Sequence, residues 1–274
     1  MIREITIGQY YPADSFIHRL DPRVKIVCTL LFLISLFVQN SLPGYLIATL
    51  FLAFVIHTSN VPFKFIVRGL KAIILLLMFT VVMNLFLTKE GNVLIHVWIF
   101  RITENGLRIS VFMAVRLIYL ILGSSLMTFT TTPNALTDAI ESLLGPLKRF
   151  KVPVHEVAMM MSIALRFIPI LLEETDKIMK AQIARGADLE SGNILQKTKA
   201  MVPILVPLVV SAFRRANDLA MAMEARCYCG GEGRTKMKPL IYQRQDFVAY
   251  TIMIAYLILV FVIGRFVPFH IWIF

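Results

Sequence analysis

Two stretches, PILLEETDKIMKAQIARG at residues 169–186 and VSAFRRANDLAMAMEARC at residues 210–227, share one layout and decide how the middle of this chain folds. Each begins with apolar residues, passes through a charged middle and ends in an alanine followed by an arginine. The spacing of apolar residues predicts two long helices, one from about residue 155 to 185 and the other from about 195 to 226. We interpret them as a matched pair of struts.

Charge order within the first stretch supports a helix. Glu173 precedes Lys177 by four residues, and Asp176 precedes Lys180 by the same interval, which is the acid-before-base order that stabilises a helix. The polar middle of this strut is therefore predicted to be helical and to carry ion pairs along its surface.

The ends of the two struts are the candidate functional site. An arginine in a last helical turn can complement the negative end of the helix dipole, and a following glycine permits the left-handed residue that ends a helix. Alternatively, a guanidinium flanked by small residues can enter a groove and form a two-pronged bond with a carboxylate of a partner protein. Two matched ends favour this second interpretation. The predicted site residues are Ala184, Arg185, Gly186, Ala225, Arg226 and Cys227.

Composition indicates an integral membrane protein. Apolar residues make up 58% of the chain, and 20 phenylalanines in 274 residues are more than one soluble core would hide. The polar residues before the first apolar run argue against a cleaved signal peptide. The first two apolar runs are separated by QNSLPG, a strong turn signal. Five runs are predicted to cross the membrane: 24–38, 45–57, about 72–87, about 109–129 and 247–264.

The region between the fourth and fifth spans is predicted to lie in the cytoplasm. Its two apolar runs, 157–172 and 201–213, are shorter than a usual span. Residues 130–245 also carry 16 lysines and arginines, and positive loops stay inside. The predicted organisation is therefore 1–129 with four spans, 130–245 as a cytoplasmic coupling domain, and 246–274 with the last span.

The same charge rule sets the orientation. With the N-terminus in the cytoplasm, Lys64, Arg68 and Lys71 lie inside, and the loop 88–107 lies outside. The cytoplasmic domain opens with a short amphipathic helix, for which Thr132 is the predicted cap; this helix is expected to stop at Gly145.

Several classes of function are disfavoured. No nucleic-acid motif accompanies the net charge of +11, and the three cysteines lack further ligands at metal spacing, so they are expected to be free thiols. No Gly-x-x-x-x-Gly-Lys-Ser/Thr loop is present, so energy from ATP would have to come from a partner. The sequence therefore predicts no catalytic residues, no cofactor and no metal.

Two rival classes can be weighed. Glu173-Glu174 is superficially like the pair of an intramembrane protease, but the arginine and histidines needed to activate water do not follow. A stand-alone secondary transporter or channel is the better alternative, and it would predict inverted repeats with broken spans. The repeat found here lies instead in the predicted cytoplasmic domain.

The residues resemble a known family, the transmembrane T component of energy-coupling factor (ECF) transporters, which are vitamin and transition-metal importers related to ABC transporters. The resemblance covers nearly the whole chain and rests on the order and spacing of five motifs. These are LDPRVK at 20–25, TTTPNALTDAIESLLGPL at 130–147, VPVHEVAMMMSIALRFIPIL at 152–171, AQIARG at 181–186 and EARCYCGG at 224–231.

The resemblance implies a membrane scaffold whose long cytoplasmic coupling helices cross as an X and end in arginine motifs. These motifs would dock onto two ABC-type ATPase subunits, and other surfaces would hold a membrane-embedded, substrate-binding S component, possibly one of several. This sequence differs from the usual pattern at Cys227, where a glycine is more common.

Three other residues have predicted roles. Asp21, followed by Pro22, is predicted to cap the first helix. Arg166, just before Pro169, is predicted either to hold the crossing of the struts or to reach lipid phosphate. Arg116 falls inside the fourth predicted span, where a charge is costly and either faces a partner or a wet cavity, snorkels to the membrane surface, or forms a local pair. The sequence leaves these alternatives open.

Overall fold

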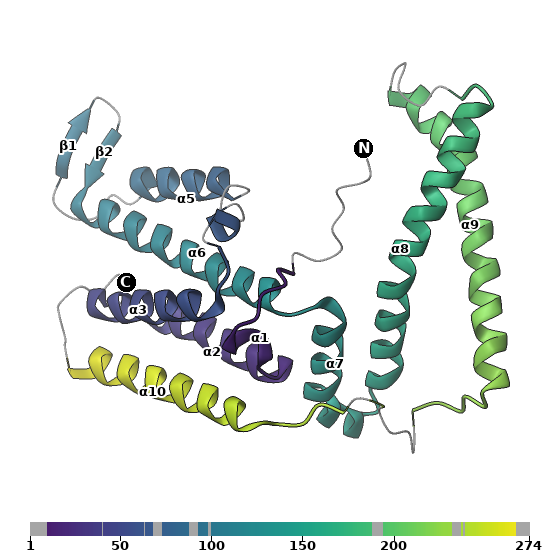
Figure 1. Cartoon of the computed structure of the whole chain (residues 1–274). Helices are drawn as coiled ribbons and strands as arrows, with labels where there is room; N and C mark the ends of the chain where they lie inside the picture. The colour runs from purple at the N-terminus through teal and green to yellow at the C-terminus, as the bar shows by residue number, and fades with distance from the viewer. Residues whose placement is uncertain are drawn as a thin grey trace. The chain divides into compact units, whose positions relative to one another are not determined.

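The computed structural model describes residues 10–39, 41–62, 64–67, 73–87, 93–97, 100–187, 194–231, 237 and 239–266. These residues form two compact units, each described by itself below (Figure 1). The bundle unit comprises the described parts of Gly8–Ala139 and Leu240–Phe274, and the strut unit comprises those of Ile140–Pro239.

Part of the predicted topology cannot be followed. Arg68, Lys71 and the predicted start of the third span at Ala72 lie outside the described residues. So do residues 88–92 and 98–99 of the predicted outer loop.

The bundle unit begins with the helices α1 (Phe16–Arg19), α2 (Pro22–Val38) and α3 (Leu42–Ser59). Helix α2 starts where the sequence predicts, because the Asp21 carboxylate accepts a hydrogen bond of 2.8 Å from the backbone N–H of Arg23 and Pro22 occupies the first helical position. Asn60 ends α3 in the left-handed conformation. The first two predicted apolar runs are thus confirmed as two helices with a short connection.

The predicted outer loop is partly ordered structure. Helix α5 (Ile74–Leu87) is followed by an antiparallel hairpin of β1 (Val93–Val97) and β2 (Phe100–Thr103). Helix α6 (Glu104–Thr130) begins earlier than the predicted fourth span, because the Thr103 hydroxyl accepts a bond of 3.1 Å from the N–H of Gly106. The prediction of a loop is therefore wrong for the described hairpin and for the first residues of α6. The β-branched side chains of β1 and β2 favour strands.

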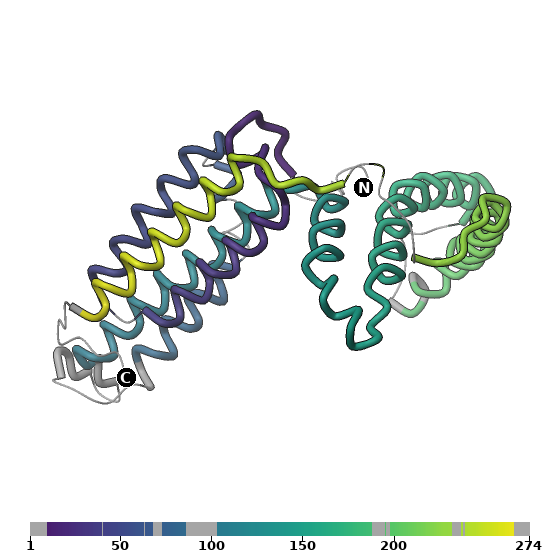
Figure 2. Tube along the Cα trace, turned by 90° about the horizontal axis from the view of Figure 1, so that it is seen from below, coloured from purple at the N-terminus to yellow at the C-terminus, as the bar shows by residue number. Residues whose placement is uncertain are grey.

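The last helix, α10 (Arg244–Phe266), completes the bundle core. Figure 2 shows α10 side by side with the earlier helices of this unit. The Tyr256 ring stacks on Phe51 with a centroid separation of 4.3 Å, and the Tyr256 hydroxyl lies 3.0 Å from the Ser35 hydroxyl. Buried core residues come from α2, α3, α6 and α10, and include Phe32, Leu36, Ala48, Leu52, Leu122, Leu126, Met253 and Tyr256.

One buried carboxylate joins the two ends of the bundle sequence. Asp246, only 2% exposed, accepts a bond of 2.8 Å from the backbone N–H of Asp21 and one of 2.7 Å from that of Gln243. It therefore caps the start of α10 and holds the start of α2 at the same time. The guanidinium of neighbouring Arg23 lies 4.0 Å from the ring centre of Tyr242.

The predicted short amphipathic helix is confirmed as α7 (Pro133–Leu143), which spans the boundary between the units. The Thr132 hydroxyl accepts a bond of 3.4 Å from the N–H of Ala135, as expected of the helix cap. A short 3-10 helix, η1 (Gly145–Phe150), follows.

The struts are α8 (Val154–Ala184) and α9 (Ile194–Ala225), of 31 and 32 residues. Both continue through internal prolines: Pro169 in α8, and Pro203 and Pro207 in α9. A proline removes one backbone bond and can kink a helix, but it need not end it. The prediction that these segments are too short to span a membrane is therefore wrong as an argument from length.

The fold class is confirmed as an α-helical multi-pass membrane protein with one small hairpin in the described residues. Five described helices are long and apolar enough to cross a membrane: Leu42–Ser59, Glu104–Thr130, Val154–Ala184, Thr198–Ala225 and Arg244–Arg265. The third and fourth of these belong to the struts α8 and α9. The predicted first and third spans are the shorter helices α2 and α5. The cytoplasmic placement of the struts consequently depends on charge alone and stays a prediction.

Candidate coupling site

The two struts run antiparallel, and two side-chain contacts fix their register. Arg215 Nη2 donates to Glu174 Oε2 at 3.0 Å, and nearer the other end Gln182 Nε2 donates to the Pro203 carbonyl at 3.3 Å. The partner number falls along α9 as the residue number rises along α8. Each arginine follows the C-terminal end of its helix, so Arg185 and Arg226 lie at opposite ends of the antiparallel pair α8 and α9 (Figure 1).

The polar middle of α8 is helical as predicted, but its ion pairs differ. In the described structure, no ion pair with a nitrogen–oxygen distance of 4.0 Å or less joins Glu173 to Lys177 or Asp176 to Lys180. Glu174 of α8 instead forms an ion pair with Arg215 of α9, so this ion pair joins the two helices. Sequence spacing within one helix could not reveal this partner, since it lies 41 residues further along the chain.

The first strut end is a Schellman turn. Arg185 is the C-cap of α8, and Gly186 follows in the left-handed region with φ of 86°. The N–H of Gly186 donates to the Ile183 carbonyl at 2.9 Å, and the N–H of Ala187 to the Gln182 carbonyl at 3.0 Å. These two bonds satisfy carbonyls that a helix end leaves without partners.

The second strut end repeats this turn residue by residue. Arg226 follows the last helical residue, Ala225, and Cys227 takes the left-handed place with φ of 55°. The N–H of Cys227 donates to the Glu224 carbonyl at 2.9 Å, and the N–H of Tyr228 to the Met223 carbonyl at 3.1 Å. The departure from glycine at residue 227 therefore leaves the turn geometry intact.

Both arginine side chains are available to a partner. Arg185 and Arg226 are exposed, as are Ala184 and Ala225 beside them. Neither guanidinium has a hydrogen-bond acceptor within the described part of the chain, so each keeps its forked set of donors free. Such an end can bind a carboxylate or a phosphate by two parallel bonds. The described residues hold no cluster of three or more metal-ligating side chains.

Arg166 and Pro169 lie on α8 away from the interhelix contacts. Arg166 is exposed, and no described residue accepts a hydrogen bond from it. The observed side-chain contacts between the struts are Arg215 with Glu174 and Gln182 with the Pro203 carbonyl, so a role for Arg166 in the crossing remains a prediction. Pro169 is inside α8 and does not interrupt it.

Arg116 has a local partner. Its side chain is 8% exposed, and its Nε donates to the Tyr45 hydroxyl at 2.9 Å while Nη2 donates to the Gln39 carbonyl at 3.2 Å. Arg116 thereby ties α6 to the connection between α2 and α3. Of the alternatives left open by the sequence, a local pair is the one observed, and its acceptors are a hydroxyl and a carbonyl.

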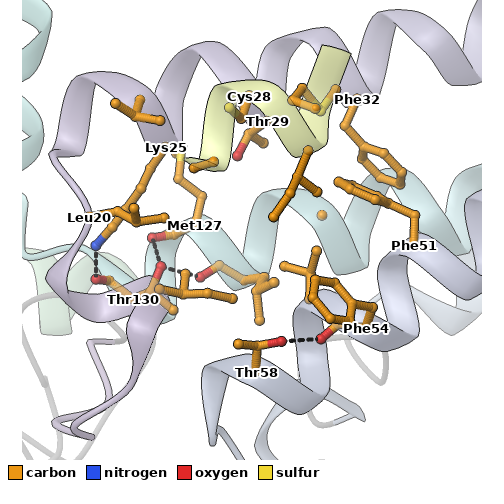
Figure 3. A pocket seen from close by; sticks show the side chains of 18 of the residues that line it. Leu20, Lys25, Cys28, Thr29, Phe32, Phe51, Phe54, Thr58, Met127 and Thr130 are labelled. Carbon is orange, nitrogen blue, oxygen red and sulfur yellow. Dashed lines mark hydrogen bonds between the residues drawn. The ribbon is translucent and has the colours of Figure 1, made fainter. Parts of the chain in front are cut away.

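The bundle unit contains a cavity of about 150 Å³ lined by α1, α2, α3, α6 and α10 (Figure 3). Its walls are apolar, and its polar groups bond to nearby backbone. Lys25 Nζ donates to the carbonyls of Thr130 and His18 at 2.8 and 3.1 Å, and the hydroxyl of Thr58 donates to the Phe54 carbonyl.

Sequence reasoning missed one contact near the second strut end. His155, in the first turn of α8, has Nδ1 2.8 Å from Glu141 Oε1 of α7, and Gly231 packs against its ring. The paired glycines at 230 and 231 are the sequence signal near this contact, but helix termination alone also accounts for them. All three residues belong to the strut unit.

Comparisons of the sequence with known proteins identify its family. The sequence profile of the family "CbiQ: Cobalt transport protein" matches residues 13–237. A protein of Clostridium kluyveri named energy-coupling factor transporter transmembrane protein EcfT is 57% identical over 250 residues, which cover 91% of this chain and 93% of that protein. Proteins of the same name from Ruminiclostridium cellulolyticum and Bacillus subtilis are 53% identical (94% and 96% covered) and 50% identical (90% and 93% covered). The chain therefore belongs to the CbiQ/EcfT family, the transmembrane components of energy-coupling factor transporters.

Proposed function

We propose that this chain couples two ABC-type ATPase subunits to a membrane-embedded S component that binds a vitamin or a metal ion for uptake. Arg185 and Arg226 each dock onto one ATPase, and the struts pass the movement of the ATPases to the S component. The chain itself is non-catalytic in this scheme. Family membership favours this role over a stand-alone secondary transporter or channel.

The observation that carries the proposal is the matched pair of arginine ends. A helix rises about 1.5 Å per residue, so the 31 residues of α8 hold the two ends roughly 46 Å apart. One small partner cannot cover both ends at that separation. Two copies of a similar partner fit this arrangement, because each copy can bind the guanidinium of one turn in a groove that contains a carboxylate.

The apolar faces of the struts support a membrane-embedded partner. On α8, exposed apolar side chains recur at helical spacing at Val157, Met160, Met161 and Ile168, and exposures range from 39% to 60%. On α9, a similar stripe includes Leu205, Val209 and Phe213. Exposed apolar stripes of this size are typical of contact with lipid or with another protein. Adaptable methionines within them suit an S component of variable surface.

The proposed orientation places the N-terminus and the struts on the cytoplasmic side. It is supported by the 16 lysines and arginines of residues 130–245 and by the positive-inside bias. This orientation brings both arginine ends to the compartment that contains ATP.

The test is co-purification of the ATPases with Arg185→Ala, Arg226→Ala and the double variant, together with ATP-driven uptake. Removing a guanidinium from a desolvated pair strands the partner carboxylate, and we expect a loss of about 2–5 kcal/mol at the corresponding ATPase site. Each single variant should retain one ATPase strongly. The double variant should lose both and still bind the S component.

Lysine replacements provide the matched control. Arg185→Lys and Arg226→Lys keep the charge but cannot form a two-pronged bond, so we expect binding between those of wild type and alanine variants. Normal ATP-driven uptake by the double alanine variant would mean that these arginines only finish their helices, and the proposal would be abandoned. Uptake by the isolated chain without any ATPase would favour the secondary transporter instead.

A further inference from the structure

The chain leaving the second strut end returns at once to the base of the first strut. After the Schellman turn at Arg226, Gly230 adopts a left-handed conformation with φ of 92°, which redirects the backbone. Gly231 then packs against the imidazole of His155 in the first turn of α8. The backbone five residues after Arg226 is therefore held by a different helix.

This contact requires glycine. A Cβ on residue 231 would overlap Cδ2 of His155 and lie 2.7 Å from its Cγ and 3.1 Å from its Cβ. Turning the ring about the Cβ–Cγ bond moves Cδ2 but leaves Cγ and Cβ in place, so it does not remove the overlap with Cγ. The backbone of Gly231 is not in the left-handed region, in contrast to that of Gly230. An alanine at 231 would thus disturb the contact without straining φ.

The imidazole itself is fixed from the other side. Its Nδ1 lies 2.8 Å from Glu141 Oε1, and the two side chains are only 21% and 13% exposed. Because Glu141 belongs to α7, three segments meet at this ring: α7, the base of α8 and the chain after α9. A ring held by a carboxylate on one side and by a backbone on the other has little freedom to move.

The position that corresponds to Gly231 at the first strut end is residue 190, which lies outside the described residues. The contact that braces a strut end is therefore described for the Arg226 turn.

We propose that Glu141, His155 and Gly231 form a positioning clamp, which holds the Arg226 turn in the orientation that its ATPase binds. The clamp acts through Arg226 and does not itself touch the partner. This inference rests on the proposed docking role of the two arginines.

The experiment measures ATPase binding at one end at a time, using full-length chain in detergent or nanodiscs. In the Arg185→Ala background only the Arg226 end binds, and in the Arg226→Ala background only the Arg185 end. We expect Gly231→Ala to weaken binding on the order of tenfold in the first background, and less than about twofold in the second. Gly145→Ala is the matched control, because a Cβ there has no neighbour within 4 Å.

A double-mutant cycle tests whether the ring is the cause. His155→Ala removes the atoms that a new Cβ would strike, so adding Gly231→Ala to His155→Ala should cost much less than adding it to the wild type. Glu141→Gln weakens the hold on the ring and should give an intermediate loss, again confined to the Arg226 end.

A spectroscopic readout separates positioning from general damage. With Cys28→Ala and Cys227→Ser, Cys229 is the single thiol of the chain and can carry a nitroxide. Gly231→Ala should raise the mobility of this label while the helical circular dichroism stays unchanged. Equal losses at both ends, or additive effects in the cycle, would overturn the clamp. Persistence of ATPase binding in the Arg185→Ala, Arg226→Ala double variant would instead overturn the docking role.

Discussion

At the scale of single residues, the two strut ends form the same turn with different residues in the left-handed position. Gly186 has no Cβ and adopts this conformation freely, whereas Cys227 adopts it against the steric preference of an L-residue. The second turn is therefore held by its surroundings, including the two backbone bonds to Glu224 and Met223.

Cys227→Gly should stabilise the second end. Relief of the left-handed strain is worth about 1 kcal/mol, and the turn hydrogen bonds do not involve the thiol. Hydrogen exchange of the peptide covering residues 220–231 would measure the change as slower local opening. Gly186→Ala is the opposite control and should speed opening at the first end by a similar amount. Unchanged exchange in both variants would show that the left-handed residue does not limit these ends.

The candidate site was predictable from sequence in part. Small-Arg-small signatures followed by turn residues located both ends, because helix termination is a local property. Contacts such as Glu174 with Arg215, or Gly231 with His155, were not predictable because they join residues whose neighbourhood is created only by the antiparallel pairing.

At the scale of elements, the struts combine an apolar face with a charged end. The exposed stripe of α8 lies in its first half, and most of its charged residues, together with Arg185, lie in its second half. One helix can therefore present chemically different surfaces to two partners.

Met160→Asp should selectively weaken assembly with the S component. Met160 is 60% exposed, and a carboxylate in its place would be buried without a partner in an apolar interface, at a cost of about 2 kcal/mol or more. Ser162→Asp is the matched control, since it adds the same charge to an exposed site on another face of the same turn. Co-purification of both partners provides the measurement. Equal loss of S component and ATPases would indicate misfolding instead.

Helix existence was predicted well, and helix length less well. Caps such as Asp21 and Thr132 act within one turn, so their helices begin where the sequence indicates. The struts are predicted to within a residue of their observed bounds, prolines included, whereas α6 begins at Glu104, before the apolar run predicted from about 109, because its first turn is polar and is capped by Thr103.

At the scale of the whole molecule, the unequal distribution of charge predicts which side of the membrane each thiol faces. Cys227 and Cys229 are exposed, while Cys28 is partly buried on α2. A membrane-impermeant thiol reagent should therefore label the first two in inside-out vesicles and not in intact cells. Detergent-solubilised protein gives the reference level of labelling. Modification of Cys227 or Cys229 in intact cells would reverse the proposed orientation.

Asp246→Ala should destabilise the bundle unit. It would leave the buried N–H of Asp21 and the N–H of Gln243 without their acceptor, at a cost of about 1–3 kcal/mol. The midpoint of thermal unfolding in detergent would measure the loss. Asp218→Ala, the same substitution at an exposed place on α9, should leave the midpoint within about a degree of wild type.

The bond between Asp21 and Asp246 also has a consequence for biosynthesis. Asp21 and Asp246 are 225 positions apart in the chain. The backbone N–H of Asp21, at the start of α2, therefore lacks this acceptor until the ribosome has made nearly the whole protein. During that time both struts are made while one flank of the bundle still lacks its last helix. Arrival of the last helix closes this flank, and chains released too early would lack the closing piece and expose a polar helix start for quality control to recognise.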